Sequence, residues 1–202
     1  DVYKRQTLSE EQKLIAEARA SKEGLQDKVS FKILDYRTDC GTFDRIVSVG
    51  MFEHVGTRNY IDYFEAIRNK LKKNGIALIH TIGRMAPPGN NSPWLDKYIF
   101  PGGYSPALSE MVASVEKNYL CITDVEVWRL HYAKTLRHWH SRFTENEKLI
   151  REIYGDRFCR MWRYYLISSE ISFRYYQHVV FQVQITKEQE ALSLIHISEP
   201  TR

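Results

Sequence analysis

The feature that most constrains the fold is a pair of short apolar runs separated by one amphipathic stretch. Residues 43–50 (FDRIVSVG) and 76–82 (IALIHTI) are typical of strands buried on both faces of a parallel sheet. The stretch between them carries apolar residues at the helical spacing i, i+3, i+4, i+7 and i+11, namely Tyr60, Tyr63, Phe64, Ile67 and Leu71. We expect this helix to end at Asn74-Gly75. A strand, a helix and a strand with short connections predict a doubly wound α/β sheet.

Further elements extend this pattern on both sides. Ser9 is a good N-cap for a helix that ends near Gly24, and a short strand is predicted at residues 29–34. A loop rich in Pro, Gly and Asn spans residues 87–93. It leads to a segment at residues 94–100, a helix at 106–117 and a strand at 120–128.

The carboxyl-terminal third departs from the alternation of strands and helices. Two long aromatic-rich helices are predicted at residues 131–154 and 156–175, and they read as a lid, about residues 130–176, inserted between the last two strands. The last strand, residues 179–185, alternates apolar and polar side chains, which predicts a half-exposed antiparallel strand. The predicted sheet is therefore mostly parallel with an antiparallel last strand.

The two ends of the chain look like translated library sequence. DVYKRQ at residues 1–6 and the start of LSLIHISEPTR at residues 192–202 can be encoded by inverted copies of one DNA segment, which resembles the transposon end used in sequencing libraries. We therefore expect one partial domain over residues 7–191, cut from a longer protein.

Charge and cysteine usage exclude several classes of protein. The net charge is +4 at pH 7, and it falls by one when the end segments are set aside, which is too small to indicate a nucleic-acid partner. The three cysteines, Cys40, Cys121 and Cys159, are widely spaced, which favours a reducing cytosol and speaks against a metal site or a disulfide framework. No apolar run approaches the roughly 20 residues that span a bilayer. We expect a soluble or peripheral protein.

Polar residues follow three of the predicted strands where each one ends. Asp35-Tyr36-Arg37 follows the first, Glu53 follows the second, and His80 lies near the end of the third. Ligands of open parallel sheets bind just beyond the carboxyl ends of the strands. Glu53 alone could be a surface acid and His80 alone a core histidine, but their shared edge favours a functional site.

Four segments carry a specific resemblance. FDRIVSVGMFEHVGTRNYIDYF, GIALIHTIG, KYIFPGG and HYAKTL resemble the cyclopropane-fatty-acyl-phospholipid synthase family, which includes the mycolic acid cyclopropane synthases, and the likeness covers residues 7–190. It implies a Rossmann-like class I methyltransferase fold in which the strands named above are strands three to seven. The Gly-rich loop after strand one and the acidic end of strand two would precede this sequence.

The resemblance also implies roles for particular residues. Cofactor-binding positions, for S-adenosylmethionine, are Thr7, Leu8, Ser9, Gln12, Asp35, Tyr36 and Arg37. Catalytic positions that hold a bicarbonate ion are Glu53, His80, Ile82 and Tyr132. Ser169 stands where many members carry an active-site cysteine in a YLxxCxxxF segment, here YLISSEISF, and this departure leaves the acceptor or the subgroup in question.

The implied reaction adds a methylene from S-adenosylmethionine to the cis double bond of an unsaturated phospholipid acyl chain. The cyclopropane ring forms through a carbocation that loses a proton to bicarbonate. The implied protein is cytoplasmic and peripheral on the inner face of the membrane, with the bilayer surface as a partner. Basic residues of the lid, Arg129, Lys134, Arg137 and Arg142, would help it dock on anionic lipid.

Two alternatives stay open from the sequence. One is a related methyltransferase that acts on a lipid or a small amine without ring closure. The other is an inactive lipid-binding homologue, which is suggested by Ser169 at the position of the family cysteine. Acyl-chain and head-group preference and the oligomeric state, a homodimer included, are not readable from the residues. Because no Gly-rich cofactor loop is present, we expect these 202 residues alone to be inactive.

Overall fold

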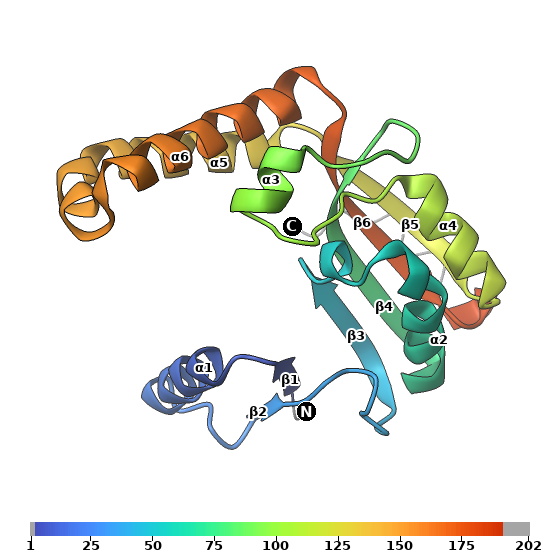
Figure 1. Ribbon diagram of the computed structural model, residues 1–202. Coiled ribbons are helices and arrows are strands. Elements are labelled where there is room, and N and C mark those ends of the chain that lie inside the picture. Colours follow the sequence, from blue (N-terminus) through green and yellow to red (C-terminus); the bar gives the residue numbers. More distant parts are fainter. Residues whose placement is uncertain (1–2, 192–202) are drawn as a thin grey trace, which may run out of the picture. The chain divides into compact units, whose positions relative to one another are not determined.

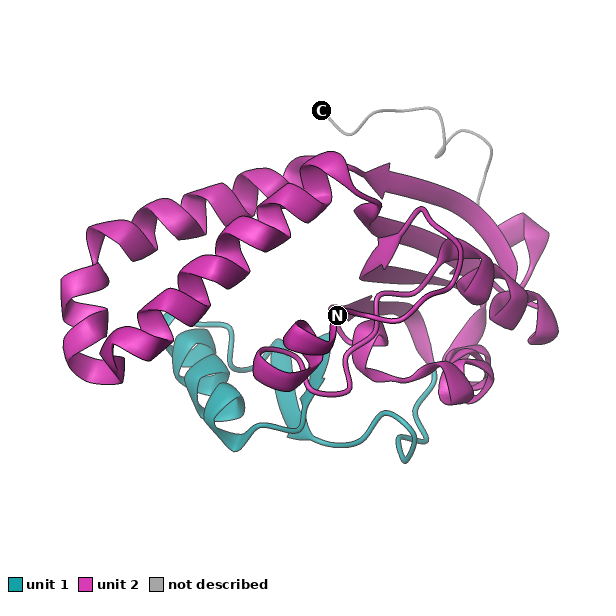
Figure 2. Ribbon diagram, turned by 45° about the horizontal axis from the view of Figure 1, so that its top comes forward, with its two compact units in different colours: residues 1–42 teal, residues 43–202 magenta. Residues whose placement is uncertain are grey.

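The computed structural model describes residues 3–191. The chain divides into two compact units, residues 1–42 and residues 43–202, and each is described here by itself (Figure 2). The first unit is a small strand, helix and strand arrangement. The second holds the larger sheet with its helices and its lid.

The first unit contains β1 (Tyr3–Thr7), α1 (Glu10–Lys22) and β2 (Val29–Ile33). The two strands are parallel, and Thr7 lies opposite Ile33. Ser9 caps α1, as predicted, by accepting a hydrogen bond from the backbone N–H of Gln12. The pairing of β1 does not test the predicted library origin of residues 1–6, because the backbone groups of almost any sequence can pair in a strand. That origin therefore stays a prediction, and residues 192–202 lie outside the described residues.

The sheet of the second unit has the order β3-β4-β6-β5 (Figure 1). Its strands are β3 (Phe43–Val49), β4 (Leu71–Arg84), β5 (Cys121–Trp128) and β6 (His178–Thr186). β3 and β4 are parallel, whereas β6 runs antiparallel to both β4 and β5. This mixed α/β sheet with an antiparallel last strand confirms the predicted fold class.

Two helices and two short 3-10 turns pack beside this sheet. They are η1 (Phe52–His54), η2 (Thr57–Asn59), α2 (Tyr60–Lys70) and α4 (Leu108–Lys117), while α3 (Pro93–Tyr98) lies in the loop before α4 and η3 (Gln189–Ala191) follows β6. Phe64 of α2, Met111 of α4 and Phe181 of β6 are completely buried. A carbon added at Gly83 would lie 2.5 Å from the Phe181 ring and 2.7 Å from the Pro106 carbonyl oxygen, so no side chain fits there.

The lid forms a helical hairpin between β5 and β6, as predicted. α5 (His131–Glu145) and α6 (Glu147–Tyr175) lie side by side and project from the sheet (Figure 1). Gly155, with φ of 80° and ψ of 169°, divides α6 into two helices, which agrees with the predicted break at this residue. The two arms are joined by a buried cluster that includes Leu136, Leu166 and Phe173.

Two helix boundaries and the exposure of one strand differ from the sequence prediction. The helix α2 ends at Lys70 and not at Asn74-Gly75, because Leu71 is already extended, is buried and pairs with Phe43 as the first residue of β4. The first lid helix ends at Glu145, where Asn146 leaves helical geometry. The strand β6 is not half-exposed, since it lies between β4 and β5 and both of its faces are largely covered.

Candidate functional site

The position of Glu53 is set by its neighbours at the end of β3. The Gly50 N–H donates to the His80 carbonyl at 3.0 Å and so ties the end of β3 to β4. Phe52 is completely buried and stacks on Tyr60 with ring centroids 4.2 Å apart. The buried ring anchors η1, and the next side chain, Glu53, is therefore held at the carboxyl edge of the sheet.

The Glu53 carboxylate is bound through one oxygen and free at the other. Its Oε1 accepts a hydrogen bond from the Ile82 N–H at 2.7 Å, and its main-chain carbonyl accepts one from the Tyr104 N–H at 2.9 Å. Its Oε2 is buried and has no hydrogen-bond partner among residues 3–191. A buried carboxylate oxygen without a partner is energetically costly, so this atom marks a place where a donor from a bound molecule is expected.

Tyr132 lies close to this carboxylate. It belongs to the first turn of α5, and its ring packs against Phe173 at 5.1 Å and Trp139 at 5.9 Å between centroids. Burial raises the pKa of the Tyr132 phenol, and the negative charge of Glu53 raises this pKa further. Tyr132 and Ile82 also pack against the same apolar cluster. Glu53, Ile82 and Tyr132 are thus brought together where the lid joins the sheet.

His80 lies on the same face of β4 as Ile82, because side chains two residues apart in a strand point the same way. Its ring meets Trp128 edge to face, with centroids 6.0 Å apart, and Trp128 in turn lies 5.2 Å from His131 at the start of α5. Within the described residues the imidazole makes no hydrogen bond, which leaves its ring nitrogens available to a ligand.

Ser169 is not joined to this group by any contact in the described residues. It is half-buried on α6, and its hydroxyl has no hydrogen-bond partner there. Its neighbour Glu170 has a structural role, because its Oε1 accepts hydrogen bonds from Arg174 at 2.7 Å and from Arg137 of α5 at 2.9 Å. The structure therefore shows a clamp between the lid helices at Glu170, and the role of Ser169 stays a prediction.

The sequence reasoning missed the residues that support Glu53 from the loop before α4. Arg84 donates to the Ser105 carbonyl and to the Asn91 side chain, each at 3.0 Å, and Asn91 donates to the Gly103 carbonyl at 2.7 Å. This network fixes the loop that presents the Tyr104 N–H to Glu53. The Pro, Gly and Asn content predicted a loop, but no sequence signal indicated its long-range anchors.

The predicted cofactor residues of the first unit gather at the carboxyl ends of β1 and β2. The Thr7 hydroxyl donates to Gln12 at 3.0 Å and accepts from the Ser9 N–H at 3.2 Å, while Leu8 is exposed. After β2, Arg37 binds the Asp35 carboxylate through both its backbone and its guanidinium group. These hydrogen bonds lower the pKa of Asp35 to about 2. Tyr36 lies between these two residues in the chain.

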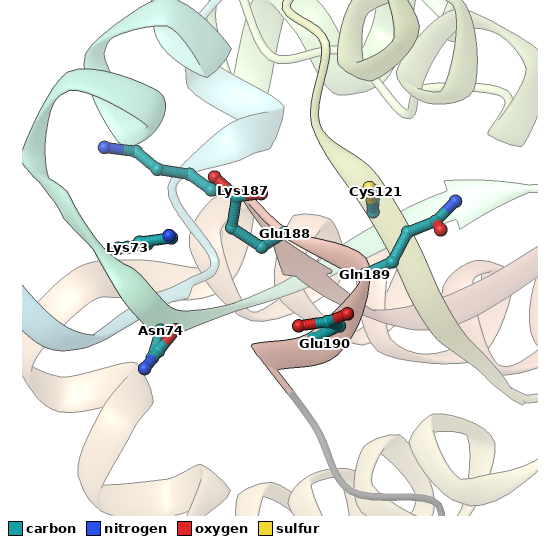
Figure 3. A pocket seen from close by; sticks show the side chains of 7 residues that line it. All are labelled: Lys73, Asn74, Cys121, Lys187, Glu188, Gln189 and Glu190. Carbon is teal, nitrogen blue, oxygen red and sulfur yellow. The ribbon is translucent and has the colours of Figure 1, made fainter.

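A pocket of about 640 Å³ lies at the opposite end of the larger sheet (Figure 3). It is lined by Lys73 and Asn74 of β4, by Cys121 at the start of β5 and by residues 187–190 after β6. The amino ends of the parallel strands β4 and β5 therefore border it, whereas the candidate residues lie at their carboxyl ends. Open parallel sheets bind ligands at carboxyl ends, so this pocket is not part of the candidate site.

Comparison with known proteins identifies the family. The family described as mycolic acid cyclopropane synthetase matches residues 4–183. The chain belongs to this family.

Curated relatives agree. The chain is 40% identical over 181 residues to a cyclopropane-fatty-acyl-phospholipid synthase of Escherichia coli, a match that covers 90% of this chain and 46% of that protein. It is 39% identical to a probable fatty acid methyltransferase of Pseudomonas putida, over 83% of this chain and 44% of that protein. The chain thus spans less than half the length of these relatives.

Solved structures show the same fold. A mycolic acid cyclopropane synthase complexed with SAH and CTAB superposes with a TM-score of 0.82 at 24% identity, covering 91% of this chain and 69% of that one. The cyclopropane synthase MmaA2 from Mycobacterium tuberculosis gives a TM-score of 0.81 at 24% identity, with the same two coverages. These likenesses place the chain in the Rossmann-like fold of the family.

Proposed function

We propose that this family member transfers a methylene group from S-adenosylmethionine to the cis double bond of an unsaturated phospholipid acyl chain and closes a cyclopropane ring. The names of the E. coli relative and of the family support this proposal. The observation that carries it is the Glu53 carboxylate, with one oxygen held by Ile82 and the other buried and unpartnered, near enough to Tyr132 to raise the pKa of its phenol.

The surroundings of Glu53 suit a reaction that passes through a carbocation. An alkene is a weak nucleophile, so the site must align it and exclude water while positive charge develops. Ile82, Tyr132 and Phe173 supply an apolar and aromatic wall beneath the lid. A cation over an aromatic ring gains about 0.5 to 2 kcal/mol, and the Glu53 carboxylate adds a negative charge nearby.

The donors around Glu53 also fit a bicarbonate ion. Bicarbonate, when bound, supplies a proton acceptor beside the reacting carbons. The raised pKa of Tyr132 keeps its phenol protonated as a donor, and His80 offers a second donor. The unpartnered Oε2 of Glu53 can accept the hydroxyl of the ion. One detail departs from the resemblance, because the Ile82 N–H already donates to Glu53 and would have to be shared.

The first unit fits part of an S-adenosylmethionine site. That cofactor supplies the one-carbon group. Thr7, Ser9 and Gln12 form a hydrogen-bonded turn after β1, and the Leu34 N–H donates to the Thr7 carbonyl at 3.3 Å, so the ends of β1 and β2 lie together. We assign Tyr36 and Arg37, which follow β2, to the adenine end of the cofactor.

The test uses a chimera in which residues 7–191 replace the matching region of the E. coli synthase. It is incubated with S-adenosylmethionine and unsaturated phospholipid vesicles, and the lipids are analysed by mass spectrometry. We expect a gain of one methylene per reacted acyl chain. Glu53→Gln should lower turnover by on the order of a hundredfold or more and leave S-adenosylmethionine affinity nearly unchanged.

The matched control is Glu65→Gln, because Glu65 is an exposed carboxylate on α2 of the same unit. This variant should turn over like the parent chimera. A Glu53→Gln variant with parental turnover would refute the assignment of Glu53.

A second candidate is methyl transfer without ring closure, favoured by the name of the P. putida relative. Its product is a methyl-branched acyl chain, formed when the carbocation either loses a proton and keeps a double bond or captures water and gains a hydroxyl group. The branched alkene has the same mass as the cyclopropane and is separated from it by proton NMR of the lipids, whereas the added water is visible in the mass spectra. If the chimera binds S-adenosylmethionine and vesicles but the lipids keep their original mass, the protein binds lipid without activity.

We also propose that the protein works in the cytoplasm at a membrane surface, with or without a second copy of itself. Among residues 3–191 no helix combines the length and apolarity needed to cross a bilayer. Contact with lipid would then occur through the surface of the protein.

A further inference from the structure

The far end of the lid hairpin is a short helix with an unusual surface. Asn146 ends α5 and Gly155 breaks α6, so the residues between them form a separate helical segment, 147–154. Figures 1 and 2 show this segment at the end of the hairpin that lies farthest from the sheet of the second unit. No residue of the candidate site belongs to it.

This segment has apolar side chains on two sides. Ile150 points inward and packs against the buried cluster of the lid. Leu149 and Ile153, one turn apart, point away from it and are 57% and 62% exposed, and Tyr154 beside them is 63% exposed. Folding of the described chain does not bury these three side chains. A cluster of large exposed apolar residues is typical of an interaction surface.

The unpaired charge near this segment is mostly positive. Within residues 142–163, Glu147 pairs with Arg151 and Arg163, and Asp156 pairs with Arg151. The exposed basic residues that make no ion pair in the described part of the chain are Arg142, Lys148, Arg157 and Arg160. The acidic residues of the range without an ion pair there are Glu145 and Glu152. The surface charge left unpaired is therefore positive.

We propose that the end of the lid, residues 148–160, is a membrane-docking element that inserts Leu149, Ile153 and Tyr154 into the interface of an anionic bilayer. A helix with an apolar side and flanking cations is what lies stably in a lipid interface. Pairing with a second copy is less favourable, since it would bring the cations of two such segments together. This inference rests on the proposed function only in placing the substrate in a bilayer.

The inference narrows the basic patch predicted from sequence. Arg137, which was expected to help docking, is 68% exposed, but its charge is paired with Glu170. Of the four residues named there, Arg142 is next to the proposed docking segment. Docking would therefore use the outer end of the lid and not its whole basic side.

The test is flotation of the 202-residue chain with vesicles of diphytanoyl phosphatidylcholine, with and without diphytanoyl phosphatidylglycerol. These lipids are fluid but contain no double bond, so binding does not require a substrate. We expect binding that needs the anionic lipid and weakens with salt. Leu149→Ser with Ile153→Ser should weaken it by at least about tenfold. Replacing Lys148, Arg157 and Arg160 with Gln should weaken it by on the order of a hundredfold.

The matched control is Ile167→Ser with Ile171→Ser. These residues have the same spacing on α6, are each 41% exposed, and lie outside the proposed segment. This variant should float like the parent, and circular dichroism should show the same helical signal for all variants. Equal loss in both apolar variants, or no flotation of the parent chain, would overturn the proposal.

Failure of the proposed function and failure of the docking element give different results in these experiments. A chimera that makes no cyclopropane but floats with these vesicles through Leu149 and Ile153 leaves the docking element intact. A chimera that makes cyclopropane but floats equally well without them overturns only the docking element. Self-association that depends on the same two residues, without flotation, would identify a second copy as the occupant and contradict the proposal.

Discussion

At the scale of single residues, the account depends on how the Glu53 carboxylate acts on the half-buried Tyr132 phenol. The bonded oxygen of Glu53 cannot turn away without breaking its hydrogen bond to Ile82, the other oxygen is buried without a partner, and the charge of the carboxylate raises the pKa of the Tyr132 phenol. The carboxylate favours the protonated phenol, since an ionised phenol would place a second negative charge beside it. Tyr132 is therefore a donor over the whole physiological pH range.

Tyr132→Phe should retain the packing of the ring but lose this donor. We expect turnover of the chimera to fall by about a hundredfold, with S-adenosylmethionine affinity unchanged, as measured by lipid mass spectrometry and calorimetry. Tyr175→Phe is the control, because Tyr175 is 77% exposed at the end of α6. Equal activity of Tyr132→Phe and the parent would remove the phenol from the mechanism.

Buried tyrosines also predict how stability depends on pH. Burial raises the pKa of Tyr60 and of Tyr132, and it raises the pKa of Tyr165 to about 12. Between the unfolded pKa of about 10 and these folded values, the unfolded chain loses protons that the folded chain retains. The free energy of unfolding should therefore fall as the pH rises above about 10.

Urea denaturation followed by circular dichroism at several pH values measures this fall. Tyr165→Phe should make the decline shallower, whereas Tyr175→Phe should not change it. A free energy of unfolding that is constant up to pH about 12 would contradict the assigned burial.

At the scale of elements, Gly83 shows how closely β4 and β6 pack. The Phe181 ring and the Pro106 carbonyl occupy the space that any side chain at Gly83 would need. Gly83→Ala should lower the free energy of unfolding by about 1 to 3 kcal/mol, because buried residues must shift. Thermal or urea unfolding measures the change.

Gly89→Ala is the comparison, since its added carbon would meet the end of the flexible Arg84 side chain. It should destabilise the protein less. A larger loss for Gly89→Ala than for Gly83→Ala would show that the contact with Phe181 is wrongly described.

Most elements could be predicted because their patterns are local. Helical spacing located α2, and helical geometry does break at Gly155, although the boundary between the two lid helices, which was predicted there, lies earlier, at Asn146. The end of α2 could not be predicted, since the pairing of Leu71 with Phe43 is a long-range contact that overrides the turn signal of Asn74-Gly75. The predicted half-exposure of β6 was also wrong, because the alternation of its residues does not reveal which strands flank it.

The candidate site was predictable in part. Strand-end position and family resemblance indicated Glu53, His80, Ile82 and Tyr132. The structure links Glu53 with Ile82 and Tyr132 and places His80 on the same face of β4 as Ile82, while the roles of these residues stay predictions. The anchors Arg84 and Asn91 lie in a loop, and their hydrogen bonds depend on how that loop folds back. The resemblance also indicated Ser169, yet no contact in the described residues joins it to Glu53.

At the scale of the whole molecule, the match to the E. coli relative covers only 46% of that protein. The first unit holds the residues assigned to S-adenosylmethionine, but the 202-residue chain does not include the Gly-rich loop that the resemblance implies for the same cofactor site. We expect calorimetry to find no tight S-adenosylmethionine binding to the 202-residue chain and clear binding to the chimera. Tight binding to the chain alone would show that residues 1–42 and their neighbours suffice.

The central claim is that Glu53 and Tyr132 act together on one bound anion. A double-mutant cycle with Glu53→Gln and Tyr132→Phe in the chimera, read as initial rates of cyclopropane formation, tests it most directly. The account predicts that the double variant is little slower than the slower single variant, because either change already disables the shared site. Losses that simply multiply would show that the two residues act independently and would contradict the account.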